Sequence, residues 1–209
     1  LSVEDVRVED NTLRVSFAPF ALQGVNWDID MVVAMEDGKH YMNTWLEIGA
    51  DDPSAAAIDY IDLDHFVIPE DAQDVWSIPD ESQISSMWIG KHELMLGQPI
   101  YADGLFFGSE FPAQETDVED DAMKIRYYSG KTIAKMAEDG QNVQNGNMFR
   151  TWNNVVGAAQ GTETAVVQTD FFDYIEDIAT PSDFRKQYNS WYDNMMNISD
   201  ASIASSFLG

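Results

Sequence analysis

The stretch Trp27-Asp28-Ile29-Asp30-Met31-Val32-Val33 decides the fold, because apolar residues occupy every second position of it and aspartates separate the first three. A β-strand turns successive side chains to opposite faces, so this spacing makes one apolar face and one polar face. Shorter alternating stretches precede it at 6–8 and 13–17. We therefore predict strands of a sheet throughout this part of the chain.

A turn sequence, Glu36-Asp37-Gly38-Lys39, follows directly, and residues 40–48 alternate again. The glycine can take the positive φ of a tight turn, so the two stretches predict a hairpin. Further short strands are expected at 58–61, 66–68, 86–89, 105–107, 123–128 and 154–159. Many short strands between turns are typical of an antiparallel β-sandwich, which we predict for residues 1–168 of a mainly β protein.

The pattern changes after Gln168, where Thr169 is placed to cap a helix. Residues 188–196 then read as a strand, and Ser199-Asp200 caps a second helix. Strand, loop and helix make a βα unit, which cannot bury both of its faces alone. We therefore predict that residues 169–209 form a helical linker and the first βα unit of a truncated (β/α)8 barrel. The first residue, Leu1, also leads us to expect a chain trimmed from a longer one.

Composition limits the partners. Thirty-seven acidic residues against 11 basic ones give a formal charge of -26, which repels a phosphate backbone and an anionic membrane surface. Neutral ligands such as sugars remain compatible, and no uncharged stretch is long enough to cross a bilayer. Because cysteine is absent, disulfides, thiolate metal sites and cysteine nucleophiles are excluded.

No residue pattern indicates a cofactor, a metal or a catalytic group. The three histidines, His40, His65 and His92, lack the spacing of metal ligands. Close carboxylate pairs such as Asp62 with Asp64 are expected by chance in so acidic a chain, and we interpret them as solvated turns. Neither a nucleophile elbow nor a phosphate-binding glycine loop occurs.

Two stretches contain candidate sugar-binding residues. In Asn189-Ser190-Trp191-Tyr192-Asp193 an indole can stack on a sugar ring, while Asn189 and Asp193 can hydrogen-bond to hydroxyls. A buried aromatic strand with a polar end would show the same residue types. Trp76, in the breaker-rich stretch 74–79, is the tryptophan expected to be exposed on a loop. Trp27, Trp45 and Trp88 are expected in the sandwich core.

Four segments carry a family resemblance: Gly104–Pro112, Tyr127–Lys131, Val155–Ala158 and Asn189–Trp191. In this order they resemble the α-galactosidase and α-N-acetylgalactosaminidase group of retaining glycoside hydrolases. The resemblance implies an N-terminal β-supersandwich of the galactose-mutarotase type, followed by a (β/α)8 barrel whose first strand would place Trp191 in the sugar subsite. It also implies that the two catalytic carboxylates lie on later barrel strands, so this chain alone should be inactive.

Two functional hypotheses follow. In the first, the chain is the non-catalytic N-terminal portion of a bacterial retaining α-glycosidase, with carbohydrate and the rest of its own barrel as partners. In the second, it is a stand-alone carbohydrate-binding or cell-surface adhesion module. Either protein could be secreted, displayed on the cell surface or cytoplasmic. A βα unit after the sandwich favours the first, because a lectin has no need of one.

Overall fold

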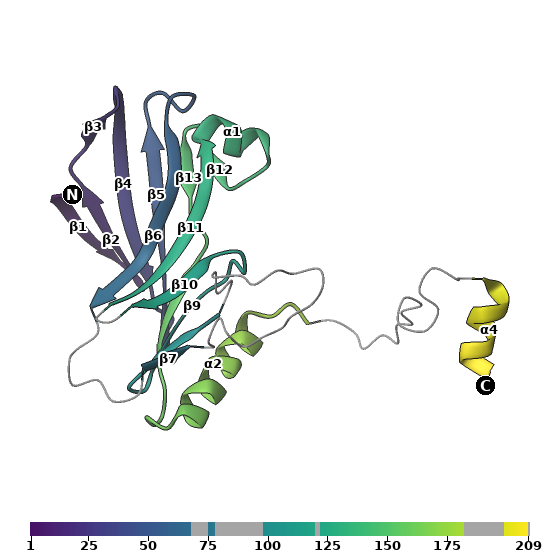
Figure 1. Cartoon of the computed structure of the whole chain (residues 1–209). Coiled ribbons are helices and arrows are strands. Elements are labelled where there is room, and N and C mark those ends of the chain that lie inside the picture. The colour runs from purple at the N-terminus through teal and green to yellow at the C-terminus, as the bar shows by residue number, and fades with distance from the viewer. Residues whose placement is uncertain (68–74, 78–97, 120–121, 182–198, 209) are drawn as a thin grey trace. The chain divides into compact units, whose positions relative to one another are not determined.

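A computed structural model describes residues 1–67, 75–77, 98–119, 122–181 and 199–208 (Figure 1). The chain divides into two compact units, Leu1–Asp177 and Ile178–Gly209, which are described separately below.

The first unit contains a large antiparallel sheet. The alternating stretch around Trp27 lies in β4, and the predicted strands before it are β1 and β2. From one edge to the other the order is β1 (Val3–Glu9), β2 (Thr12–Phe17), β4 (Val25–Ala34), β5 (Tyr41–Ala50), β14 (Asn154–Ala158), β9 (Leu105–Ser109), β8 (Ile100–Ala102) and β7 (Val75–Ser77). Three short strands extend it: β3 (Phe20–Leu22) beside β4, β13 (Met148–Arg150) beside β5, and β12 (Val143–Gln144) beside β13.

The predicted hairpin is confirmed. Strands β4 and β5 pair antiparallel from Trp27 opposite Ala50 to Ala34 opposite Asn43. In the turn between them the Lys39 amide donates to the Glu36 carbonyl at 3.1 Å, and Gly38 has a φ of +81°. Glycine adopts that φ without a steric cost, which is why it occupies the turn.

A second, three-stranded sheet covers one face of the large sheet (Figure 1). Its order is β10 (Glu115–Glu119), β11 (Ala122–Thr132) and β6 (Ala57–Val67). Apolar side chains of both sheets bury each other, including Trp27 and Ile48 from the large sheet and Ile61 and Tyr127 from the small one. The predicted antiparallel β-sandwich in a mainly β protein is therefore confirmed. Helix α1 (Ile133–Glu138) adds the buried Ile133 and Met136 to this core.

The opposite face of the large sheet carries helix α2 (Thr164–Ile178). Consecutive residues show the two faces: Phe106 packs with Phe171 and Tyr174 of α2, whereas Phe107 packs with Met123 and Ile125 of β11. We call the side of the large sheet that bears α2 its α2 face. The described layers thus enclose three apolar clusters, two between the sheets and one between the large sheet and α2.

The predicted start of this helix is wrong. We expected Thr169 to cap it, but α2 begins at Thr164, and the Thr169 hydroxyl donates to the Ala165 carbonyl at 2.8 Å inside the helix. The apolar stripe extends back to the buried Val167, in a β-branched stretch whose local preference is for strand. Packing on the large sheet overrides that preference.

In the second unit, α4 (Asp200–Leu208) is the predicted terminal helix. The Ser199 hydroxyl accepts from the Ser202 amide at 3.1 Å, and the Ser202 hydroxyl accepts from the Ser199 amide at 2.9 Å. This reciprocal pair caps the helix at its predicted start. The strands expected at 86–89 and 188–196 lie outside the described residues, so the predicted βα unit and the predicted domain limits stay predictions. Within the described part of the chain, no helix has the length and apolar character that a membrane crossing requires.

Candidate functional site

The sugar-binding residues predicted from sequence are not brought together within the described structure. Asn189, Trp191 and Asp193 lie outside the described residues. The backbone of Trp76 lies in β7, opposite Tyr101 of β8, so this residue is in an edge strand and not in the loop that we predicted. The free edge of β8 offers backbone groups with which even a breaker-rich stretch can pair.

The tryptophans of the alternating strands divide between the two faces of the large sheet. Trp27 is buried in the sandwich core, as predicted. Trp45 lies instead on the α2 face, because it is paired with Val32 and not with the core-facing positions of β4. The prediction that Trp45 belongs to the sandwich core is therefore wrong, and its indole is available to polar partners.

A band of polar side chains runs along the α2 face beside the helix. We call it the polar band; its members are Arg14, Asp30, Asn43, Trp45, Glu47, Glu110, Arg150, Asn153 and Tyr174. They come from β2, β4, β5, β13, the segments after β9 and β13, and α2. The chain therefore folds together residues that are widely separated in sequence.

At one end of the band Arg14 joins two carboxylates. Its Nη1 donates to Asp30 Oδ2 and to Glu47 Oε2, both at 2.7 Å. Asp30 and Glu47 are directly opposite each other in the β4–β5 pairing, so the cation separates two like charges. The hydrogen bond from Arg14 holds the pKa of Glu47 below its usual value, and Glu47 remains ionised.

In the middle of the band Trp45 contacts two charged side chains, Glu47 and Arg150. Its Nε1 donates to Glu47 Oε1 at 3.2 Å, and the Arg150 guanidinium carbon lies 4.3 Å from the centre of its ring. Such a cation–π contact orients both side chains. Burial lowers the pKa of Arg150 from its ordinary value, and the nearby Glu47 and Glu110 carboxylates oppose this shift.

At the other end Glu110 accepts three hydrogen bonds. Asn153 Nδ2 donates to Oε2 at 2.9 Å, and the Tyr174 hydroxyl and Asn43 Nδ2 donate to Oε1 at 3.0 and 3.4 Å. Burial raises the pKa of Tyr174, so its hydroxyl keeps the proton that it donates. Asn153 in turn accepts from Arg150 Nη2 at 2.7 Å, which links both ends of the band.

This arrangement suits recognition more than proton transfer. Acidic and basic groups alternate along it, and every carboxylate already accepts from a cation, an amide or a hydroxyl. Amide, guanidinium and carboxylate groups fixed beside an indole can exchange hydrogen bonds with the hydroxyls of a neutral ligand. Sequence reasoning missed Glu110, although it lies inside the resemblance segment Gly104–Pro112.

One buried carboxylate is a second finding that the sequence did not reveal. Asp64 is only 7% exposed, and Asn154 Nδ2 donates to its Oδ2 at 2.9 Å. Burial raises its pKa from 3.8 to about 6, against the opposing hydrogen bonds from Asn154 and Thr44. The interpretation of Asp62 and Asp64 as a solvated turn is thus wrong. Both lie in β6, where a register shift opposite Ile125 and Arg126 turns Asp62 outward and Asp64 inward.

The histidines have no metal-binding arrangement in the described residues. His40 packs edge-on against Tyr41 and Phe106, and His65 is paired with Lys124 on the small sheet. His92 lies outside the described residues. Across the described ranges, no group of three or more His, Asp or Glu side chains is placed to hold a metal ion.

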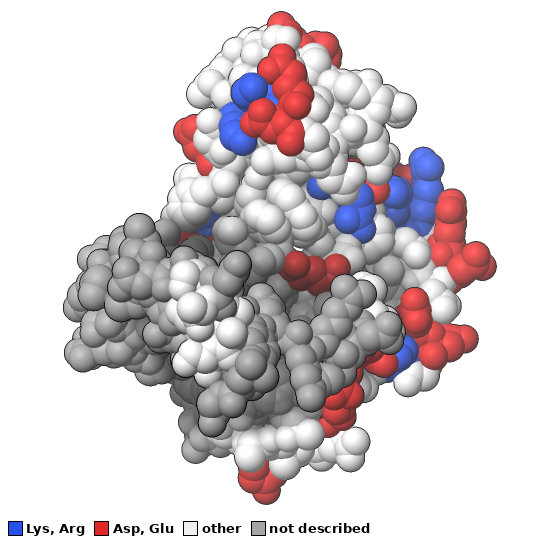
Figure 2. Space-filling model, turned by 90° about the vertical axis from the view of Figure 1, so that its right-hand side faces the viewer, with Lys and Arg blue, Asp and Glu red and all other residues white. Residues whose placement is uncertain are grey.

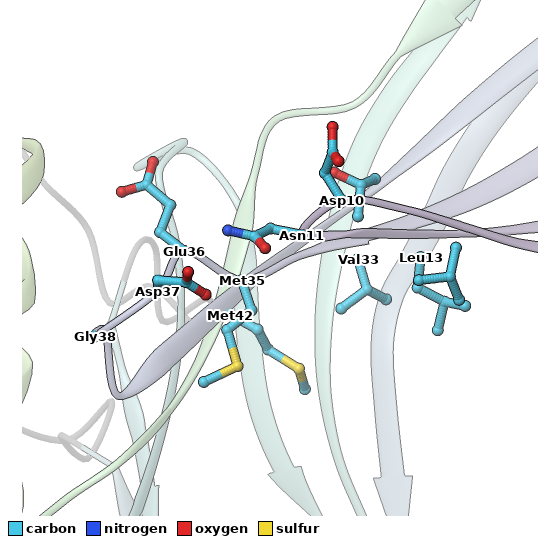
Figure 3. A pocket seen from close by; sticks show the side chains of 11 residues that line it. Asp10, Asn11, Leu13, Val33, Met35, Glu36, Asp37, Gly38 and Met42 are labelled. Carbon is cyan, nitrogen blue, oxygen red and sulfur yellow. The ribbon is translucent and has the colours of Figure 1, made fainter.

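A shallow groove of about 400 Å³ lies between the β1–β2 turn and the β4–β5 turn. Figure 3 shows the side chains of Leu13, Val33, Met35 and Met42 pointing to one side of the strands. The carboxylates of Asp10 and Glu36 point to the other side (Figure 3). Polar residues, among them Asn11, Thr12 and Asp37, also line the groove, so its lining is mixed.

The charged surface is mixed and mainly acidic. On the face shown in Figure 2, the Lys and Arg side chains lie next to Asp and Glu side chains. Ion pairs of the described residues include Lys131 with Asp139 at 2.6 Å and Lys135 with Asp139 at 3.0 Å, both near α1. Cations compensated in this way are a poor surface for nucleic acid.

Among the described residues, fold and site together define an antiparallel β-sandwich with helix α2 on one face and a polar band of mixed charge beside that helix. No family model, curated protein or solved structure matches the chain.

Proposed function

We propose that this chain is a non-catalytic sandwich domain that supports carbohydrate binding and hydrolysis, as the N-terminal part of a bacterial retaining α-glycosidase of the α-galactosidase or α-N-acetylgalactosaminidase type. The proposal requires a catalytic barrel on the same polypeptide. In this proposal Trp191, Asn189 and Asp193 belong to the sugar subsite of that barrel.

The observation that supports the proposal is the meeting of the resemblance segments. Strand β9 lies within the resemblance segment Gly104–Pro112, and the segment Val155–Ala158 lies within β14. The two strands are direct neighbours, with Gly108 opposite Val155. Just beyond these strands Glu110 and Asn153 are joined at 2.9 Å. Segments far apart in the sequence thus build one polar place on the α2 face.

The chemistry of that place fits a neutral sugar. Glu110 and Asn153 present oxygen and nitrogen atoms at the surface, with Arg150 behind them. The two arginines of the band offset two of its three carboxylates, so a neutral polyhydroxylated ligand meets little net charge there, whereas an anion meets the overall charge of -26.

The test compares two polypeptides on p-nitrophenyl α-galactoside and α-N-acetylgalactosaminide. The longest natural polypeptide that contains this sequence should hydrolyse at least one of them, and this chain alone should hydrolyse neither. Loss of the charge in Glu110→Gln should raise KM in the long polypeptide about tenfold at nearly unchanged kcat.

The matched control is Glu176→Gln, at an exposed position of α2 outside the band, which should leave KM unchanged. A long polypeptide inactive on both substrates would contradict the proposal. Equal KM values for the Glu110 and Glu176 variants would show that the polar band does not contribute to substrate binding.

A stand-alone carbohydrate-binding module is the second candidate. It is favoured by an exposed pair of tyrosines on the small sheet, Tyr60 and Tyr128. A natural polypeptide that ends near Gly209 and binds sugar without hydrolysing it would support this candidate over the first.

A further inference from the structure

The outer face of the three-stranded sheet carries an aromatic cluster that the polar band does not include. Tyr60 of β6 is directly opposite Tyr128 of β11, and Asp62 is opposite Arg126. The residues between them, Ile61 and Tyr127, are buried in the core. Alternation therefore turns the four side chains of this cluster away from the core.

The two tyrosines are unusually open for large aromatic residues of a sheet. Tyr60 is 51% exposed and Tyr128 is 49% exposed. Their ring centres are 6.2 Å apart and the ring planes meet at 58°. The two tilted rings thus lie side by side at the surface, and we call this pair of rings the trough.

Charged neighbours hold the trough in place. Arg126 donates to both oxygens of Asp62, with Nη2 at 2.9 Å from Oδ2. Its guanidinium carbon lies 4.0 Å from the centre of the Tyr60 ring and 5.9 Å from that of Tyr128. A bidentate ion pair whose guanidinium contacts the Tyr60 ring restricts the rotamers of these side chains, which lowers the entropy cost of binding a ligand.

We propose that Tyr60, Tyr128, Arg126 and Asp62 form a binding platform for a neutral pyranose sugar with an apolar C–H face. The ring faces pack on the C–H bonds of the sugar, and the ion pair exchanges hydrogen bonds with its hydroxyls. Since Asp62 neutralises Arg126, the platform has no excess positive charge to attract an anion.

The choice of sugar rests on the proposed function and deepens it. Galactose and N-acetylgalactosamine are pyranoses with one face rich in C–H bonds, so both fit an aromatic trough. The platform lies on the small sheet, whereas the polar band lies on the α2 face of the large sheet. Its role is to retain sugar chains at the protein and not to take part in hydrolysis.

The experiment titrates this chain with methyl α-galactoside, methyl α-N-acetylgalactosaminide and methyl α-glucoside, and follows the tyrosine ring signals by NMR. The two galacto-configured sugars should shift the signals of Tyr60 and Tyr128. Tyr60→Ala and Tyr128→Ala should each weaken binding about tenfold, because each removes a stacking ring. Tyr60→Phe and Tyr128→Phe keep the rings and should retain most of the affinity.

Phe172→Ala is the matched control, since Phe172 is a 54% exposed aromatic residue on α2, and it should leave binding unchanged. Circular dichroism and the melting temperature check that each variant is folded, and the signal shifts of the unaltered chain test the platform without any variant. Absence of shifts with both galacto-configured sugars, or equal binding by the alanine variants and the unaltered chain, would overturn the platform. If the long polypeptide hydrolyses an α-galactoside while this chain shows no tyrosine-dependent sugar binding, the proposed function stands and the platform is wrong. If this chain binds sugar through the tyrosines but the long polypeptide hydrolyses neither substrate, the platform is supported and the glycosidase function is contradicted.

Discussion

At the scale of single residues, burial changes what a side chain does. Asp62 and Asp64 are two positions apart in one strand, yet Asp62 is held in an ion pair by Arg126 whereas Asp64 is enclosed in the core. The same carboxyl group therefore has a lowered pKa at Asp62, through the Arg126 hydrogen bond, and a raised pKa at Asp64, through burial. Stability at different pH values should report this difference.

Asp64→Asn should stabilise the protein at neutral pH. The folded protein binds a proton at Asp64 with a pKa of about 6, against 3.8 as the ordinary value. The stabilisation that protonated Asp64 contributes is complete below about pH 4 and is lost as the pH rises to about 6. At pH 7 the cost of the buried charge is about 3 kcal/mol, and the uncharged amide avoids it.

Urea denaturation of both chains between about pH 4 and about pH 7 measures this difference. The gain of Asp64→Asn should grow over that interval, while the exposed control Asp59→Asn should show no such growth. A gain that is the same at both ends of the interval would show that the charge is not its cause.

Gln114→Met should also stabilise the protein. Gln114 is fully buried, and neither Oε1 nor Nε2 of its side chain has a hydrogen-bond partner among the described residues. An unsatisfied buried amide costs about 1–3 kcal/mol, and methionine has a similar shape without polar atoms.

Thermal and urea denaturation check this gain. The control is Gln141→Met. Gln141 Oε1 accepts a hydrogen bond from the Tyr127 hydroxyl at 3.3 Å, so removing this amide should not raise the free energy of unfolding. A drop in stability for Gln114→Met would mean that the amide has a partner after all.

At the scale of elements, β9, β14 and α2 act as one packed unit. Gly157 of β14 is directly opposite Phe106 of β9, and the Phe106 ring lies over it. Phe106 is itself packed against Phe171 and Tyr174 of α2. The absence of a side chain at Gly157 is thus a condition for seating the helix on the sheet.

Gly157→Ala should destabilise this unit strongly. A Cβ at this position would lie 1.9 Å from the Phe106 ring, which is fully buried and packed against Phe171 and Tyr174. Overpacking of this kind costs about 1–3 kcal/mol and sometimes more. Urea denaturation gives the loss.

Gly49→Ala on β5 is the control for this change. A Cβ there would have ordinary contacts of 3.7 Å with Asp28, so the stability should barely change. Equal effects of the two substitutions would mean that loss of glycine, and not the Phe106 contact, is responsible.

At the scale of the whole molecule, charge opposes compactness. A formal charge of -26 on 209 residues produces self-repulsion that salt screens. Because acidic residues outnumber basic ones by 37 to 11, most carboxylates have no basic side chain with which to pair.

Sodium chloride should therefore raise the melting temperature by a few degrees between about 0.01 M and about 0.1 M, as the Debye length falls from about 30 Å to about 10 Å. Differential scanning calorimetry measures the slope of the melting temperature against salt concentration. A chain carrying Glu4→Gln, Glu9→Gln and Asp173→Asn, all at exposed positions, should show a smaller slope. A melting temperature that falls with salt would contradict dominance by repulsion.

The sequence by itself determined the mainly β class, the position of most described strands, the β4–β5 hairpin and the cap of α4. These follow from alternation, turn residues and caps, which act over a few positions. The tertiary structure alone decided that Trp45 faces the α2 side, that Asp64 is buried and that Glu110 meets Asn153. The physical reason is that each depends on strand pairing across many residues, and a shift of one position in that pairing turns a side chain from water to core.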